Sequence, residues 1–182
     1  MKKIICLISV CFLFIESNAQ SLSSAGIKEQ MVKDWQRAKD YTLEYLNTMP
    51  VDKYSFKPND SVRTFAGHML HHASITVYLI SVANDIQPLP WLSRELQNRP
   101  SAQNKDSVMY YVMASYDYAI KAVQNSDTSK WGEIKKLNFG AEVSATRFAL
   151  MNKAFEHQEH HRAQTTVYIR MQGIRPPNER LF

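Results

Sequence analysis

Apolar residues recur at spacings of three and four over most of the chain, which is the period of an amphipathic helix. In the first such segment, Ser24 is a candidate N-cap and Pro50 would end the helix. The second segment runs from about residue 61 to about 84, with Ser61 as its candidate N-cap. The apolar faces carry Ile27, Met31, Trp35, Ala38, Thr42, Tyr45 and Met49 in the first segment, and Thr64, His68, His71, Ile75, Tyr78 and Val82 in the second.

Two further helices are predicted in the C-terminal half, over about 104–124 and about 142–172, the second ending before Gly173. The proline-rich residues 86–103 predict a long connection with one short helical turn, and residues 130–140 a polar loop. No segment has the alternation typical of a strand, so we predict none. The apolar stripes are Val108, Val112, Tyr116, Ala119 or Ile120, and Val123 in the third helix, and Leu150, Ala154, His157, His161, Tyr168 and Met171 in the fourth.

Four amphipathic helices can cover their apolar stripes only by packing against one another. The expected fold class is therefore all-α, a four-helix bundle. Functional sites in bundles are built from inward side chains on facing helices, so the chemistry should be sought there.

The N-terminus has the pattern of a secretory signal peptide. Lys2 and Lys3 precede an apolar run, which is too short to span a membrane, and small residues follow it. We expect residues 1–19 to be cleaved, which leaves one domain over residues 20–182. Both cysteines lie in the leader, so the exported protein, periplasmic or secreted, would have no thiol ligand and no stable membrane insertion.

Composition and charge narrow the function classes further. The chain is 45% hydrophobic and 21% charged, which is typical of one packed domain rather than a disordered one. Its formal net charge is +5, but the basic residues form no dense run interleaved with aromatics. Nothing therefore indicates nucleic-acid binding.

All six histidines lie within residues 68–72 and 157–161. His157 and His161 are four residues apart, about 40° around a helix, so both imidazoles can reach one point. This spacing is typical of metal ligands, and a third ligand would have to come from the other stretch. Geometry on one helix does not choose cleanly among the histidines there, although it disfavours His72. The alternative is that each stretch combines surface residues with a hydrogen-bonded core histidine.

Known metal and nucleophile motifs fit the sequence poorly. A zincin has Glu directly after its first histidine, whereas Gln158 follows His157 here. The Glu-x-x-His motif of ferritin-like di-iron sites and the Gly-x-Ser-x-Gly elbow of hydrolases are both missing. Glu156 and Glu159 could orient a ligand imidazole, although exposure to solvent is the expected outcome for both.

Two stretches resemble a known family. Residues 157–177 read HQEHHRAQTTVYIRMQGIRPP, which resembles the closing helix of the DinB family, including its Arg, Gln and Tyr-x-Arg-x-x-Gly positions. Residues 63–73 read RTFAGHMLHHA, which looks like the second helix of that family. The resemblance covers essentially the whole exported chain and implies a bundle with up-down-down-up helix order.

The resemblance also implies a metal site. His71, His157 and His161 would be the ligands of one divalent ion, zinc or nickel, with iron or manganese as alternatives. Three neutral imidazoles leave an open coordination position, which is typical of a catalytic site. The other histidines, His68, His72 and His160, would be supporting or surface groups.

These expectations favour a metal-dependent enzyme that acts on a small molecule, either as a thiol-dependent S-transferase or as a hydrolase, two activities the resemblance implies. The alternative is a non-catalytic metal-binding or stress-related module in which the ion is structural. A third possibility is a metal-free bundle that binds an apolar ligand among Trp35, Tyr45, Tyr78 and Tyr168. A homodimer is compatible with the sequence.

Overall fold

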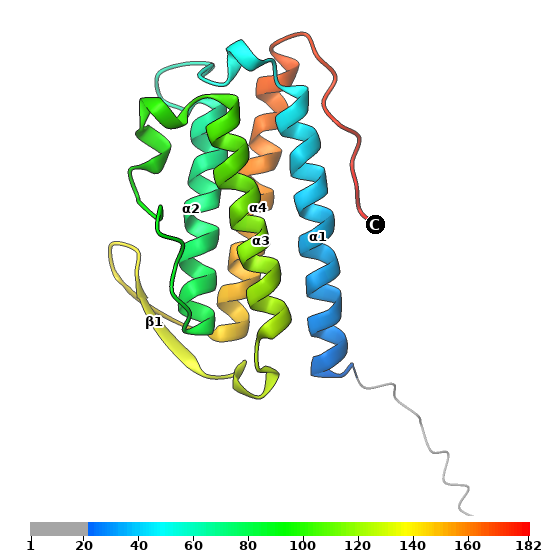
Figure 1. Ribbon diagram of the computed structural model, residues 1–182, viewed down its shortest axis with the longest axis vertical. Helices are drawn as coiled ribbons and strands as arrows, with labels where there is room; N and C mark the ends of the chain where they lie inside the picture. The colour runs from blue at the N-terminus through cyan, green and yellow to red at the C-terminus, as the bar shows by residue number, and fades with distance from the viewer. Residues whose placement is uncertain (1–21) are drawn as a thin grey trace, which may run out of the picture.

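Four long helices form the bundle in the computed structural model, which describes residues 22–182 (Figure 1). They are α1 (Ser24–Thr48), α2 (Phe65–Asn84), α3 (Lys105–Asn125) and α4 (Arg147–Arg170). The predicted four-helix fold is confirmed. The predicted signal peptide and the start of the exported chain at Gln20 lie outside the described residues. No helix within the described range is long and apolar enough to cross a bilayer.

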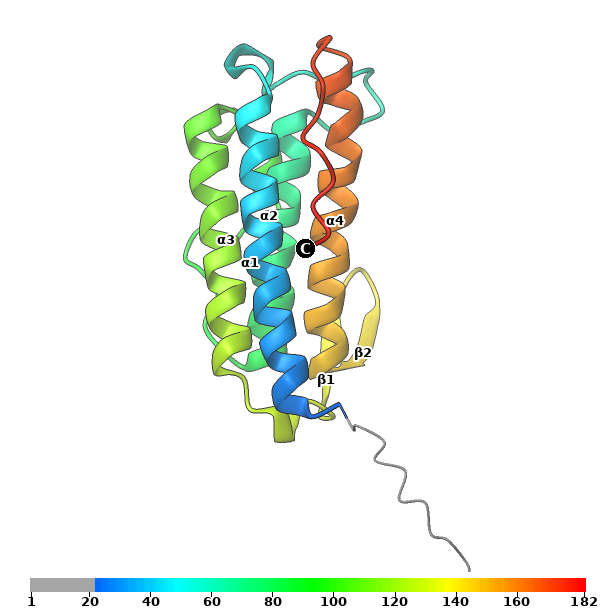
Figure 2. The same ribbon diagram turned by 90° about the vertical axis from the view of Figure 1, so that its right-hand side faces the viewer.

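The helix order follows from contacts between helix ends. The Thr64 hydroxyl at the start of α2 donates to Gln103 Oε1, 2.6 Å away and just before α3. Lys28 in the first turn of α1 donates to the carbonyl of Ser126 at the end of α3. Hence α2 and α3 run in the same direction, while α1 and α4 run in the opposite one (Figures 1 and 2). The up-down-down-up order is therefore confirmed, and residues 85–104 are the crossover that it needs.

Two predicted helix caps are wrong by one to three residues. Ser23, not Ser24, caps α1, because its hydroxyl accepts the backbone N–H three residues on. Thr64 caps α2 in the same way. Ser61 lies instead in a turn, where its N–H donates to Asn59 Oδ1. Both corrections follow the same rule, since the cap is the residue whose side chain reaches the first free N–H groups.

The prediction that the chain has no strand is also wrong. Strands β1 (Ile134–Asn138) and β2 (Glu142–Thr146) form an antiparallel hairpin. Gly140 at the tip has φ +90°, a conformation that favours glycine. The fourth helix consequently begins at Arg147 rather than near residue 142, with Thr146 as its N-cap.

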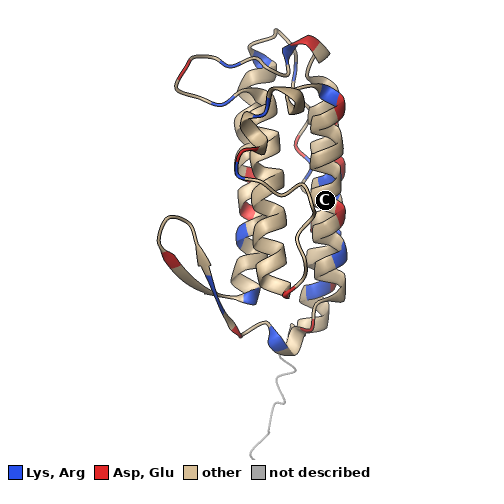
Figure 3. Cartoon of the chain, turned by 60° about the vertical axis from the view of Figure 1, so that its left-hand side comes forward, with Lys and Arg blue, Asp and Glu red and all other residues tan. Residues whose placement is uncertain are grey.

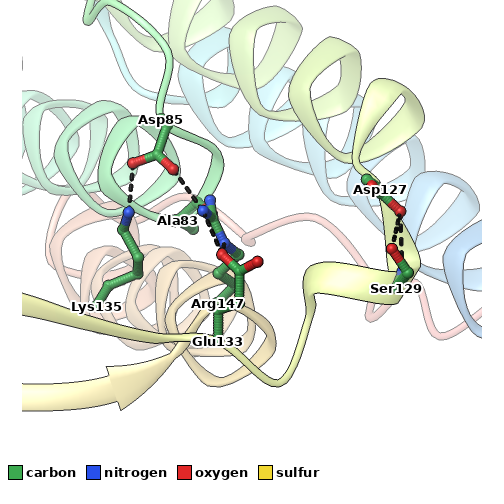
Figure 4. Close-up of polar contacts among 7 residues, drawn as sticks. All are labelled: Ala83, Asp85, Asp127, Ser129, Glu133, Lys135 and Arg147. Atoms are coloured by element: carbon green, nitrogen blue, oxygen red, sulfur yellow. Dashed lines mark hydrogen bonds and ion pairs between the residues drawn. The ribbon is translucent and has the colours of Figure 1, made fainter.

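The hairpin base is anchored to the end of α2 by charged groups (Figure 4). Arg147 donates to the carbonyl of Ala83 at 2.8 Å and to Glu133 Oε2 at 2.9 Å, and it also binds Asp85. Lys135 of β1 donates to the same Asp85 carboxylate. Asp85 is the left-handed C-cap of α2, with φ +52°. Asp85 therefore ends α2 with its backbone and holds both the hairpin and the start of α4 with its carboxylate.

Helix α2 is the central element of the bundle. It carries no charged residue, whereas the other three long helices carry charges of both signs (Figure 3). It packs against α3 and α4 and is also covered by the crossover. The predicted apolar face of α2, which carries His71, Ile75 and Tyr78, is partly exposed, whereas the opposite side of the helix is fully buried. The fully buried apolar residues of α2 include Phe65, Met69, Leu70, Val77 and Ile80.

Candidate metal centre

His71, His157 and His161 come together where α2 packs against α4. One ring nitrogen from each lies within 4.8 Å of the other two. The ring centroids of His157 and His161 are 4.5 Å apart, and those of His71 and His161 are 4.7 Å apart. The structure thus brings together the three histidines selected from sequence. His161 is buried, while His71 and His157 are partly exposed, and His71 lines a cavity beside the cluster.

Burial keeps these imidazoles neutral. It lowers the pKa of His71 to about 4, with the nearby Arg63 and His157 adding to the effect. Burial lowers the pKa of His157 to about 4 and that of His161, which is also surrounded by other histidines, to about 2. At neutral pH each ring therefore has a lone pair available for a cation. The group fits a divalent ion of the zinc or nickel type, for which imidazole is a preferred ligand.

A second observation is consistent with this fit. His157 Nδ1 is buried and has no hydrogen-bond partner within the described part of the chain. Both ring nitrogens of the core residue His72 are likewise without a partner there, so at His157 the unpaired nitrogen is compatible with an ion but does not distinguish one.

His68 continues the site beyond the three clustered rings. Its Nδ1 lies 3.0 Å from His161 Nδ1, and its Nε2 lies 3.0 Å from the Tyr168 hydroxyl. The Tyr168 hydroxyl donates to the carbonyl of Arg63 at 2.7 Å. A chain of hydrogen bonds therefore runs from His161 through His68 and Tyr168 to the backbone at the start of α2.

The polarity of this chain determines the tautomers. Tyr168 uses its single proton on the carbonyl of Arg63, so its oxygen must accept from His68 Nε2–H. Burial lowers the pKa of His68 to about 4, so its Nδ1 is unprotonated and accepts from His161 Nδ1–H. In the neutral His161 ring, Nε2 is then the nitrogen with the free lone pair. Such partners fix the orientation of metal-ligating histidines.

The remaining histidines differ from one another. His72 is fully buried against Tyr116, and burial lowers its pKa well below the usual value. It therefore belongs to the core behind the cluster and is not a surface group. His160 is exposed and lies within hydrogen-bonding distance of Gln164.

The acidic residues near the cluster are paired elsewhere. Glu156 is exposed and forms an ion pair with Lys153 at 2.6 Å. Glu159 lies 3.8 Å from the buried Arg162. His68, rather than a carboxylate, is the hydrogen-bond partner that orients the imidazole of His161. Sequence reasoning placed His68 on the right helix face but had no signal for its contact with Tyr168, because the two residues come from different helices.

Arg162 anchors a buried polar network behind the cluster. Its guanidinium donates to Gln158 Oε1 at 2.7 Å and to the Thr42 hydroxyl at 3.2 Å. Tyr116 of α3 donates to the same Gln158 oxygen. The network connects α4 to α1 and α3, so it holds α4, and with it two of the clustered histidines, in place. Arg170 lies instead at the exposed end of α4.

Two cavities adjoin the histidines. One of about 550 Å³ has His71 in its wall, and one of about 1190 Å³ has His68 and Tyr168 in its wall. Gln97 of the crossover lines both cavities, and its Oε1 accepts a hydrogen bond from Arg63. Small molecules therefore have room on two sides of the site. Trp35 and Tyr45, considered above as lining for an apolar ligand, are buried core residues.

Comparison with known proteins agrees with this architecture. A family model described as the DinB family matches residues 19–180. Among solved structures, a DinB-like protein from Bacillus cereus is similar with a TM-score of 0.67 and 16% identity, over 84% of this chain and 97% of that one. A conserved protein from Enterococcus faecalis is similar with a TM-score of 0.62 and 19% identity, over 79% and 95% respectively. Comparison with curated proteins gives no match.

Proposed function

Because this chain belongs to the DinB family and its His71, His157 and His161 form one cluster of neutral imidazoles, we propose that it is a metal-dependent enzyme acting on a small molecule. The family membership confirms the resemblance noted in residues 63–73 and 157–177. The single observation that carries the proposal is the meeting of one ring nitrogen from each of these histidines within 4.8 Å.

The three imidazoles would hold one divalent ion, with zinc or nickel as the ions best suited to this donor set. When bound, such an ion supplies Lewis acidity, which polarises an electrophile and lowers the pKa of a water or a thiol. Three protein ligands leave a coordination position for a substrate, as in catalytic rather than structural zinc sites.

The chain's own residues contribute binding and orientation. His68 and Tyr168 fix the ring of His161 through the hydrogen-bond chain described above. The apolar surface of α2 excludes water from the inner side of the site, and the two cavities give access from outside. Neither Glu156 nor Glu159 is positioned by its contacts as a general base, since each is paired with a cation.

Both reaction classes remain in the proposal, transfer of a thiol to an electrophile and hydrolysis. The predicted leader would place the protein outside the cytoplasm, periplasmic or secreted, whereas low-molecular-weight thiols are mainly cytosolic. That argument favours hydrolysis.

Metal content tests the proposal directly. Protein purified without a polyhistidine tag should contain about one divalent ion per chain by elemental analysis. His157→Ala should lose it, because two imidazoles hold an ion weakly, whereas His160→Ala on the exposed side of the same helix should retain it. Unchanged stoichiometry in His157→Ala would remove the proposed site.

Activity is then measured on the metal-loaded protein with a panel of esters, amides and thiol-conjugation substrates. The expected result is turnover that a chelator abolishes and added metal restores. Full metal content without turnover on any of these substrates would count against an enzyme and favour a structural ion.

A further inference from the structure

The cavity beside His71 has a composition that indicates a class of ligand. It lies between α2, the crossover and the tip of the hairpin, and its volume is about 550 Å³, within the range of small-molecule sites. Its wall is formed by His71, Ser74, Ile75, Tyr78, Leu92, Ser93, Arg94, Gln97, Phe139 and Gly140. Three separate segments of the chain therefore contribute to one wall.

One side of the cavity is apolar and aromatic. Ile75 and Tyr78 come from α2, Leu92 from the crossover and Phe139 from the hairpin tip. The rings of Tyr78 and Phe139 meet edge to face at 5.5 Å, and the Tyr78 hydroxyl accepts the N–H of Asn138. The hairpin tip is thus held against α2 by the same residues that line the cavity. Such a surface suits a ring or a branched aliphatic chain.

The charge in the lining of this cavity is positive only. Arg94 is the charged residue in this lining, and no Asp or Glu accompanies it. One guanidinium nitrogen of Arg94 donates to the carbonyl of Asn138 at 3.2 Å, which ties the arginine to the hairpin tip. A guanidinium has five N–H donors in a planar fork, so others remain for a planar acid group.

The cavity at the C-terminal ends of α2 and α3 provides a contrast. It has a similar volume of about 480 Å³, but its lining mixes Lys121 and Lys130 with Asp85 and Asp127. Its Arg147 is already paired with Glu133. Charges of both signs line that cavity, whereas the lining of the cavity with Arg94 contains no acid. The cavity lined by His68 and Tyr168 also carries basic residues, Lys57 and Arg63, without an acid, so both cavities next to the histidines have charge of one sign.

We propose that this cavity binds a small organic anion with an aromatic or branched aliphatic body. The body packs against Ile75, Tyr78 and Phe139, the acid group lies on Arg94, and the opposite end of the molecule is directed to His71. The orientation toward His71 rests on the proposed function, since it makes that end the reacting one. The hairpin tip is accordingly part of the specificity of the site.

The experiment uses matched probes and the metal-free protein. The affinities of 4-phenylbutanoate, 4-phenylbutan-1-ol and butanoate are measured by NMR titration of the methyl groups of Ile75 and Ile134. We expect 4-phenylbutanoate to bind most tightly and to shift the Ile75 signal, while Ile134, exposed on β1, does not respond. Butanoate should bind weakly, because it has the acid without the ring.

Two arginine variants separate the charge from general binding. Arg94→Gln should weaken 4-phenylbutanoate about three- to tenfold, to the level of the alcohol, and leave the affinity for the alcohol unchanged. Arg99→Gln, a second exposed arginine of the crossover outside this cavity lining, should change neither affinity. Phe139→Ser should weaken the acid and the alcohol alike.

Equal affinity for acid and alcohol in the unmodified protein, or an unchanged acid affinity in Arg94→Gln, would overturn the proposal. The metal content of His157→Ala is an independent measurement. Acid binding that depends on Arg94 in a protein without a metal site would refute the proposed function alone. A metal site without this binding preference would refute the cavity proposal alone.

Discussion

At the scale of single residues, the most informative contact is the one between His68 and His161. Because Tyr168 must donate to a carbonyl, the direction of every hydrogen bond in the chain follows, and His161 is left with its free lone pair on Nε2. His68 is therefore a positioning residue for the proposed metal site, although it lies outside the cluster of three.

Two substitutions test this role of His68. His68→Leu should weaken metal binding about ten- to hundredfold, as is usual when the hydrogen-bond partner of a ligand is lost. His68→Gln should retain most of the affinity, because its amide oxygen can accept from His161 and its NH₂ can donate to Tyr168.

Nitrogen-15 NMR of the metal-free protein supplies a second measurement, since it reports the tautomer of His161. We expect the Nδ1–H form in the unmodified protein and in His68→Gln, and a mixture in His68→Leu. The role is refuted if both variants bind metal as the unmodified protein does, or if His68→Gln loses as much affinity as His68→Leu.

At the scale of elements, the hairpin shows how a segment can be misread. Residues 142–146 were expected to begin the last helix, but Glu142–Thr146 pairs with Ile134–Asn138 as a strand. The ladder joins neighbouring segments, whereas the Arg147–Asp85 contact ties the base of the hairpin to the distant end of α2, and pairing and tertiary contacts of this kind override local propensity. The hairpin tip then completes the wall of the cavity beside His71.

Arg147→Met should loosen the hairpin without unfolding the bundle. The substitution removes the bonds to Ala83 and Glu133 and leaves Asp85 with Lys135 alone. Hydrogen exchange of the amides of β1 should become faster by about tenfold, while the amides of α2 remain protected.

Lys136→Met is the matched control, because Lys136 pairs with Glu142 inside the hairpin and not with α2. Equal exchange rates in β1 for Arg147→Met and Lys136→Met would contradict the anchoring role of Arg147.

At the scale of the whole molecule, the buried histidines make stability depend on pH. In the folded, metal-free chain the pKa of His68, His71 and His157 is about 4, against the usual value near 6.5. Below pH 6.5 the unfolded chain takes up protons that the folded chain does not, so the free energy of unfolding falls as the pH falls toward 4.

Each pKa unit corresponds to about 1.4 kcal/mol per group, and partial exposure and mutual coupling reduce the sum. We expect a loss of roughly 2–5 kcal/mol between pH 6.5 and 4, measured by urea unfolding in the presence of a chelator. His157→Gln, which cannot titrate, should reduce this loss. A flat profile between pH 6.5 and 4.5 would contradict the burial of neutral imidazoles.

The sequence by itself determined the four helices, their inward faces on α1 and α3, and the two histidine stretches. These features follow from the helical period, which is local, and from the i, i+4 spacing of His157 and His161. The family resemblance added His71 and the helix order. Periodicity disfavoured His72 but could not choose between His68 and His71, because both lie on the same face of α2.

Only the tertiary structure decided what each α2 histidine contacts. The rotation of α2 against α4 directs His71 to the cluster, His68 to His161 and Tyr168, and His72 into the core near Tyr116. It also decided the hairpin and the cavity that the hairpin tip closes over α2. The physical reason is that the histidine contacts and the cavity wall join residues far apart in sequence, so they depend on how the elements pack rather than on the period of any one helix.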